Sequence, residues 1–163
     1  MLRVAIRVNN DAHARVGPLS LNVNNSRTLT DKEVREYMQS TIRAARGDFA
    51  RVSLSCFAHQ VPNAAQRKII FEEMEQHGLP ALARTALLTD SGLMRGALTA
   101  YSWVTRSDSD AFAIADRRRA LVWLAERASF DVEEAMQTLD GCFAAVGVTP
   151  RCAWPGGARR AAK

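Results

Sequence analysis

The chain has 163 residues, of which 47% are hydrophobic and 24% charged, a composition typical of a globular protein with one sizeable core. No apolar run approaches the roughly 18 residues that a membrane-spanning helix needs, and the N-terminus alternates Arg with Val and Ile where a signal peptide would be apolar. We therefore expect a cytoplasmic protein without a membrane span.

The positive charge is concentrated at the C-terminal end. Residues 151–163 carry four cations and no acid, so removing them lowers the net charge from +5 to +1. Arg117, Arg118 and Arg119 are consecutive and therefore spread around a helical turn instead of forming one basic face. Such a tail attracts polyanions in a non-specific, salt-sensitive way, and we do not expect nucleic acid to be the partner.

Two β-strands are predicted near the N-terminus. Apolar and polar residues alternate from Leu2 to Val8 and again from Leu19 to Val23, the period of strands with one solvated face. Residues 9–11 are Asn-Asn-Asp, which favours a turn, and Gly17-Pro18 interrupts the chain before the second strand. The short connection favours an antiparallel hairpin at the less protected edge of the sheet.

Helices and strands alternate between residues 30 and 104. A Thr-Asp-Lys-Glu capping box begins an amphipathic helix over residues 30–47. Residues 49–58 contain a strand that we expect at the centre of the sheet, covered on both faces. A second helix spans 63–77 with Asn63 as its N-cap. Residues 86–104 combine a short apolar strand, a Thr-Asp-Ser-Gly turn and a third helix.

The remaining elements are a strand and two helices. Phe112–Ala115 is a short apolar run that we expect to be the last strand, and Asp116 can cap the helix that follows. A second capping box starts at Asp131 and opens a helix that ends at Gly147. Beyond Pro150 no periodic pattern remains.

The order of these elements predicts an α/β fold, with a mixed sheet of about five strands covered by helices. We expect residues 1–128 to form this domain. Residues 129–148 would add a C-terminal helix packed on the domain or on a partner, and 149–163 would be a basic, flexible tail.

Residues 2–125 resemble the STAS family, the fold of sulfate transporters and anti-sigma-factor antagonists, and within it the SpoIIAA-like branch of small free-standing proteins of myxobacterial type. The resemblance rests on the opening strands and first helix, on the later alternation of strands and helices, on Arg95 inside the third helix, and on Ala-Leu-Val-Trp-Leu at 120–124. It implies a STAS-like sheet and a regulatory function.

The resemblance also implies a position for a phosphorylation switch. Antagonists of this family carry a phosphorylatable Ser or Thr at the start of the helix after the central strand, usually in an Asp-Ser-Ser-Gly-Leu setting. By element order this switch-loop position is Asn63, which has no hydroxyl. The most similar string, Thr-Asp-Ser-Gly-Leu at 89–93, comes one strand and one helix later and makes Ser91 the candidate phospho-acceptor. Either the switch is absent or Ser91 is the acceptor; Ser91 and Asp90 can also be simple helix caps.

No motif in the chain predicts catalysis. Gly-x-Ser-x-Gly is missing, and neither Cys-x-x-Cys nor His-x-x-x-His spacing occurs, so we predict no catalytic residue, no metal site and no cofactor. Cys56, Cys142 and Cys152 are an odd number without a close pair, which favours reduced thiols. We expect a non-enzymatic STAS-like regulatory or scaffold protein that binds another protein or a second copy of itself. The alternative is a small-molecule or lipid-binding domain with a pocket between the helices and the sheet.

Overall fold

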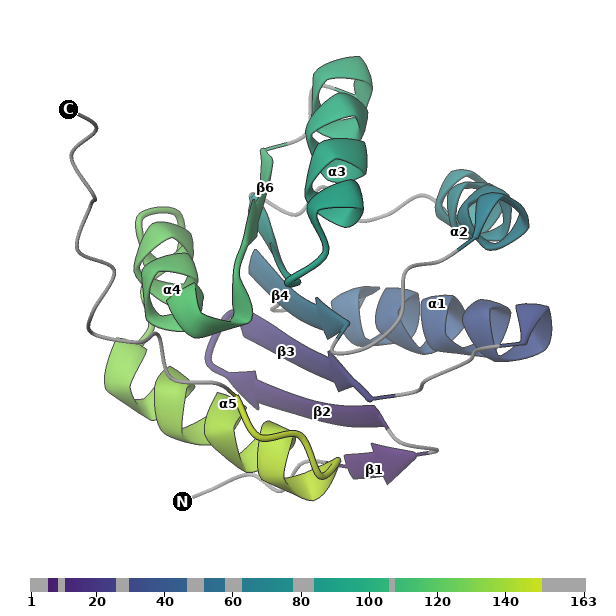
Figure 1. The fold of residues 1–163 in the computed structure, drawn as a ribbon. Coiled ribbons are helices and arrows are strands. Elements are labelled where there is room, and N and C mark those ends of the chain that lie inside the picture. Colours follow the sequence, from purple (N-terminus) through teal and green to yellow (C-terminus); the bar gives the residue numbers. More distant parts are fainter. Residues whose placement is uncertain are drawn as a thin grey trace, which may run out of the picture.

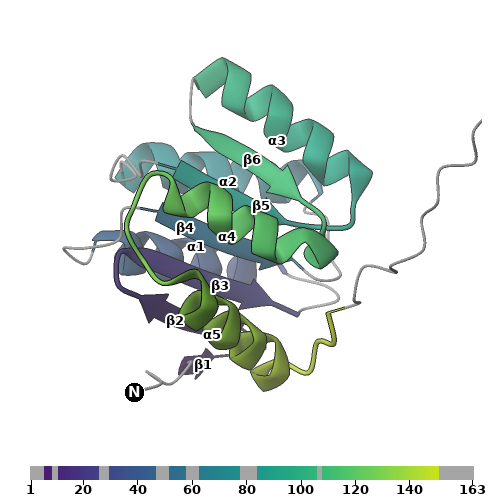
Figure 2. The same ribbon diagram turned by 90° about the vertical axis from the view of Figure 1, so that its left-hand side faces the viewer.

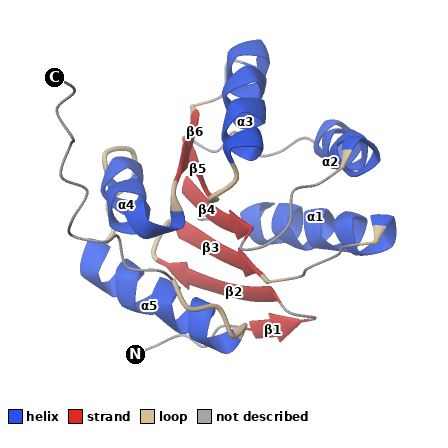
Figure 3. Ribbon diagram, viewed as in Figure 1, coloured by secondary structure: helices blue, strands red, loops and turns tan. Residues whose placement is uncertain are grey.

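One mixed sheet with helices on both faces organises the fold (Figures 1 and 3). The computed structural model describes residues 6–8, 11–25, 30–46, 52–57, 63–77, 84–105 and 108–150. The strands lie in chain order, as β1 (Ile6–Val8), β2 (Asp11–Val16), β3 (Leu19–Asn24), β4 (Val52–Phe57), β5 (Arg84–Leu88) and β6 (Ser109–Phe112). The strands β1 to β3 are antiparallel, whereas β3 to β6 are parallel.

The helices form two layers. One layer contains α1 (Asp31–Arg46), α2 (Ala64–His77) and α3 (Gly92–Thr105), and the other contains α4 (Arg117–Ala125), preceded by the short 3-10 helix η1 (Ile114–Asp116), and α5 (Val132–Ala145). Figure 2 shows α4 and α5 in front of the sheet, with α1 and α2 behind it. The α/β class predicted from the sequence is therefore confirmed. None of the helices in the described part of the chain has the length and apolar character needed to span a membrane.

The N-terminal part of the sheet differs from the prediction. Residues 11–16 form β2, so the sheet has six strands, and β2 lies between the two predicted strands. These two strands therefore do not form a hairpin with each other; β2 forms one with β3 through a tight turn at Gly17, whose φ is +52°. The strand β3 is buried along its length and does not lie at an edge. The last strand begins at Ser109, earlier than predicted, and residues 114–116 form η1 instead.

The face of the sheet toward α4 and α5 is apolar. Alternate residues of each strand point to this side, where α4 contributes Leu121 and Leu124, and α5 contributes Leu139 and Phe143, all fully buried. The expected apolar stripe of the C-terminal helix thus packs on the chain's own sheet, against β2 and β3. The strand residues in this core are Ala12, Val16, Leu19, Leu21, Val23, Val52, Leu54, Cys56, Ala86, Leu88 and Phe112.

Ion pairs connect α4 to α5. Arg117 Nε lies 3.0 Å from Asp140 Oδ1, and the Arg118 guanidinium donates to both carboxylate oxygens of Glu133. Arg119 lies over an aromatic ring of β6, with its Cζ 6.0 Å from the ring centroid. Two of the three consecutive arginines are therefore neutralised by α5.

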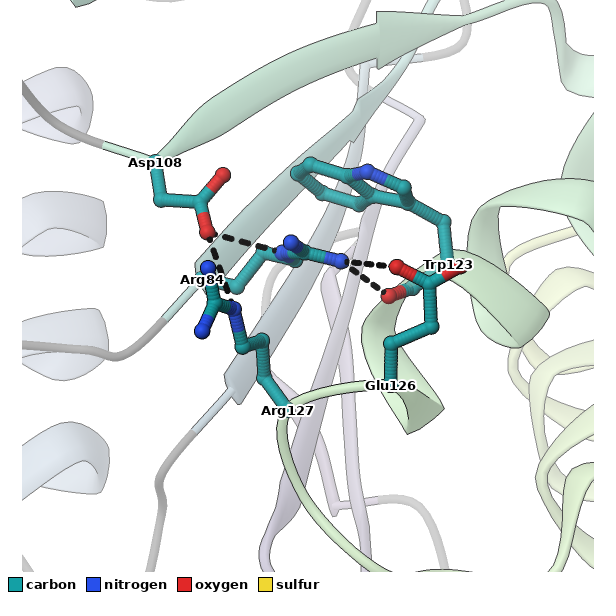
Figure 4. Close-up of polar contacts among 5 residues, drawn as sticks. All are labelled: Arg84, Asp108, Trp123, Glu126 and Arg127. Carbon is teal, nitrogen blue, oxygen red and sulfur yellow. Dashed lines mark hydrogen bonds and ion pairs between the residues drawn. The ribbon is translucent and has the colours of Figure 1, made fainter.

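A second group of ion pairs, drawn in Figure 4, fixes the end of α4 to the sheet. Arg84, the first residue of β5, is buried with only 9% of its side chain exposed. It donates to Asp108 at 2.9 Å, to the Trp123 carbonyl at 2.6 Å and to Glu126 at 2.7 Å, and its guanidinium stacks 4.2 Å from the Trp123 ring centroid. Arg127 also approaches Asp108, at 3.4 Å.

The helices α1 and α2 are joined by a buried carboxylate. Glu73 of α2 is 1% exposed, accepts hydrogen bonds from Arg35 and Gln39 of α1, and has His77 Nε2 at 3.4 Å. Burial acts to raise the pKa of Glu73, but the hydrogen bonds from Gln39 and Arg35 and the charge of Arg35 hold it below its usual value. The carboxylate therefore stays ionised and holds the two helices together.

The strand β6 forms one edge of the sheet. Thr89 donates its backbone N–H to the Phe112 carbonyl at 2.9 Å, so the polar backbone groups of Phe112 point toward β5. Those of the preceding residue, Ala111, therefore point away from β5. The carboxylate of Asp110 accepts a hydrogen bond from the N–H of Ala111 at 2.8 Å. The Asp110 side chain thus provides an acceptor for this outward-pointing backbone N–H of the edge strand.

Candidate functional site

The N-termini of α1, α2 and α3 follow the carboxyl ends of β3, β4 and β5. Each helix connects parallel neighbours in the sheet, so all three begin at the same edge, which we call the carboxyl edge. In open α/β sheets this is where loops and helix N-termini are available to a partner. The residues that the sequence analysis singled out, Asn63 and Ser91, lie at this edge, at the starts of the consecutive helices α2 and α3.

The caps of α1 and α2 are closed by side chains, as predicted. Thr30 Oγ1 accepts from the N–H of Glu33 at 3.3 Å, while Glu33 Oε2 accepts from the N–H of Thr30 at 2.7 Å. These hydrogen bonds lower the pKa of Glu33. Asn63 Oδ1 accepts from the N–H of Gln66 at 2.9 Å, and Gln66 Oε1 accepts from the N–H of Asn63 at 3.0 Å. An amide side chain, without a hydroxyl, therefore caps α2.

In the turn before α3, residues 89–91, each side chain accepts a hydrogen bond from a backbone N–H. Thr89 Oγ1 accepts from the N–H of Ser91 at 3.2 Å, and Ser91 Oγ accepts from the N–H of Met94 at 3.3 Å. Asp90 Oδ1 accepts from the N–H of Ile114 at 3.1 Å, which connects this turn to η1. Ser91 is thus the N-cap of α3, and Asp90 is not a cap of this helix but a link between two turns.

The described thiols are unsuited to nucleophilic chemistry. Cys56 and Cys142 are free and buried. Burial, with a smaller effect of the Asp90 charge, raises the pKa of Cys56 to about 12, and burial raises the pKa of Cys142 to about 11. Both thiols therefore stay protonated at neutral pH. Cys152 and the basic tail from residue 151 onward lie outside the described residues, among which no cluster of three or more His, Cys, Asp or Glu could hold a metal ion.

The outer face of α3 presents an apolar side chain to solvent. Leu93 lies in the first turn of α3, next to Ser91, and is 70% exposed. From the sequence, Leu93 and Met94 both fit the apolar stripe, and the structure assigns only Met94 a partly buried position. Gly96 lies one turn further along and is exposed; apart from adjacent residues and the backbone of α3, no described atom lies within 4 Å of the position that a Cβ would occupy.

Asp11, the first residue of β2, has a partly buried carboxylate. Because Asp11 pairs with Asn24, it lies beside the carboxyl end of β3. Asp11 accepts a hydrogen bond from Asn24 Nδ2, with His13 and Glu33 also close enough to affect its titration. Burial raises the pKa of Asp11 to about 6, against the opposing effects of the Asn24 hydrogen bond and of His13; Glu33 adds to the rise. This carboxylate could not be predicted as part of a strand, because residues 9–11 have the composition of a turn.

Asp11 should make the fold more stable as the pH falls toward 4. Its folded-state pKa is above its unfolded value, so its stabilising contribution is present below about pH 4 and is lost as the pH rises through about 6. We expect Asp11→Asn to stabilise the protein at pH 7.5 by up to about 1 kcal/mol, because the variant keeps the oxygen that accepts from Asn24 and removes the partly buried negative charge. Screening by solvent limits the size of this gain. Urea unfolding at pH 5 and 7.5 measures this effect, and a variant less stable than wild type at pH 7.5 would contradict it.

Comparison with known proteins identifies the family. The model of a family described as SpoIIAA-like matches residues 21–125, which run from β3 to the end of α4. No curated protein and no solved structure gives a significant match. The match covers more than half of the chain and includes the carboxyl edge with Asn63 and Ser91, whereas β1, β2 and α5 lie outside it. The chain belongs to the SpoIIAA-like family, as its resemblance at the sequence level indicated.

Proposed function

We propose that this chain is a non-enzymatic regulatory or scaffold protein that binds another protein through the outer face of α3 at the carboxyl edge. Family membership supports a regulatory domain of the anti-sigma-factor-antagonist type. The exposure of Leu93 in the first turn of α3 supports this location for the contact. The apolar stripe of α5 is used by the chain's own core, which leaves α3 as the better candidate surface.

Leu93 carries the proposal, because its large apolar side chain is 70% exposed in the first turn of α3. A glycine inside a helix destabilises the helix by about 1 kcal/mol relative to alanine. Apart from adjacent residues and the backbone of α3, no described atom lies within 4 Å of a Cβ built at Gly96. The missing side chain at Gly96, one turn from Leu93, lets the backbone of a partner approach α3 closely.

In this proposal the binding is not controlled by the family's phosphorylation switch. Asn63 holds the N-cap of α2 with an amide oxygen that accepts from Gln66, and no hydroxyl is present to receive a phosphate. Ser91 is the alternative acceptor. Its Oγ accepts from the N–H of Met94, and a phosphate there would lie beside the positive end of α3.

Substitutions on α3 should separate binding from folding. Gly96→Ala is expected to stabilise the fold by about 0.5–1 kcal/mol, because alanine favours the helix, and at the same time to weaken partner capture. Leu93→Asp should abolish capture with little effect on stability, because Leu93 is 70% exposed. Quantitative mass spectrometry of proteins cross-linked in cells measures capture, and sedimentation of the purified protein tests a second copy as the partner.

Gly141 provides the matched control. It is an exposed glycine inside α5, and apart from adjacent residues and the backbone of α5, a Cβ there also meets no described atom within 4 Å. Gly141→Ala should therefore give the same gain in stability and leave capture unchanged. If Gly96→Ala and Leu93→Asp retain every partner that the wild type and Gly141→Ala capture, then α3 is not the binding surface.

A further inference from the structure

The helix α3 carries one charged side chain, Arg95, among its 14 residues. Arg95 is exposed, and it forms no ion pair with any other residue in the described part of the chain. Many cations of the other helices are neutralised within the chain. Those that lie next to one of its carboxylates are Lys32, Arg35, Lys68, Arg117 and Arg118. Arg95 is thus available to a carboxylate from outside the chain.

The exposed residues of α3 form a strip with two different borders. A helix turns by about 100° per residue, so Gly92, Gly96 and Thr99 lie along one line, with Leu93 on one side and Arg95 on the other. All five are exposed. Apart from adjacent residues and the backbone of α3, no described atom lies within 4 Å of a Cβ built at either glycine. The strip therefore has bare backbone along its middle, an apolar border and a positively charged border.

The place of α3 in the fold leaves this strip accessible. Figures 1 and 2 show α3 at the β6 end of the sheet, where no further strand follows. The residues between the exposed ones, Met94 and Leu98, are partly buried and lie on the opposite side of the helix. The exposed strip is therefore not the surface by which α3 packs on its own domain.

The shape and charge of the strip select the kind of partner. Packed helices lie about 8–10 Å apart, and they approach most closely where side chains are small, as at Gly92 and Gly96. The phosphates of a nucleic acid and the anionic surface of a membrane each require several cations on one face, and α3 offers one. A single carboxylate is sufficient to pair with Arg95.

We propose that the partner of α3 is an amphipathic helix that packs along Gly92 and Gly96, with apolar side chains against Leu93 and an Asp or Glu against Arg95. The packing excludes water from the side of the ion pair, which strengthens the pair relative to one on an open surface. This inference rests on the proposed function, because it names the partner that the same surface takes.

Reversing the charge of Arg95 tests the acidic border. Arg95→Glu places like charges together and should lower partner capture roughly tenfold or more, measured in cross-linked cells as for Leu93→Asp. Arg119 is the matched control, because it is also exposed but lies on α4. Arg119→Glu makes the same change in net charge and should leave capture unchanged. Thermal unfolding of both variants verifies that each is folded.

Replacing Arg95 by lysine identifies the group that it meets. Arg95→Lys keeps the charge and should retain capture, and a carbodiimide joins its new amine directly to a carboxylate in contact with it. We expect a cross-link from position 95 to an Asp or Glu in a helical segment of the partner, and none from position 119 of Arg119→Lys. Changing that partner acid to Lys should restore capture by Arg95→Glu.

The other outcomes overturn the inference in distinguishable ways. If Leu93→Asp abolishes capture and Arg95→Glu does not change it, the acidic border is wrong and the proposed function stands. Capture that survives both substitutions contradicts both proposals. Equal losses with Arg95→Glu and Arg119→Glu would mean that net charge, and not α3, governs capture. A dimer in which α3 packs on α3 of a second copy also contradicts the inference, since this helix carries no carboxylate.

Discussion

Deleting residues 130–163 is expected to abolish cooperative folding. The deletion removes α5, whose Leu139 and Phe143 are fully buried against β2 and β3. Burial of these two side chains alone contributes roughly 3–6 kcal/mol, comparable with the roughly 5–15 kcal/mol by which a native domain is stable. The deletion also exposes the apolar side chains that β2 and β3 direct toward α5. Thermal unfolding followed by circular dichroism, together with binding of an apolar dye, measures the loss.

Deleting only residues 151–163 is the control. It leaves every described residue in place, so cooperative unfolding near the wild-type midpoint is expected. We propose on this basis that α5 belongs to the same folding unit as the family segment, even though the family match ends at residue 125. Wild-type unfolding of the 1–129 fragment would show instead that α5 is a separable helix.

Arg84→Met should cost about 2–3 kcal/mol of stability. The substitution keeps an apolar stem but removes the charged hydrogen bonds to Asp108 and Glu126, the bond to the Trp123 carbonyl and the stacking on the Trp123 ring. Both carboxylates are partly exposed, at 37% and 61% of their side chains, so water can replace the lost cation and limits the cost. Urea unfolding measures the change.

Arg127 is the matched control for Arg84. Its side chain is 57% exposed and approaches the same carboxylate, Asp108, at 3.4 Å. Because exposed ion pairs contribute little, Arg127→Met should change stability by less than about 0.5 kcal/mol. Equal effects of the two substitutions would mean that the buried contacts of Arg84 do not hold α4 to the sheet.

The parts of the fold that local signals specify could be predicted from the sequence. Thr30, Asn63 and Asp131 cap helices because the interacting groups are two or three residues apart, so the order of residues alone brings them together. The strand β2 was missed because its apolar positions, Ala12, Ala14 and Val16, are small, and the residues before it favour a turn. The boundary of β6 was missed because Ser109 and Asp110 are polar residues of an edge strand.

The candidate sites were predictable only in part. Ser91 and Asn63 were placed correctly at helix starts by the same local signals. The exposure of Leu93 depends on how α3 is rotated on β6. The apolar stripe in the sequence does not determine whether Leu93 or Met94 faces the sheet. The side chains that face one another across the sheet depend on the register between strands far apart in sequence, as in the pairing of Ser53 with Thr85.

The hydrogen bond between Asp110 and the N–H of Ala111 also limits how copies of this chain can associate. A free edge strand offers its backbone donors to any extended peptide, and this is how sheets of separate molecules fuse and aggregate. Here a negatively charged side chain competes for the donor and repels an identical strand approaching from outside. Self-assembly by continuing the sheet past β6 is therefore disfavoured.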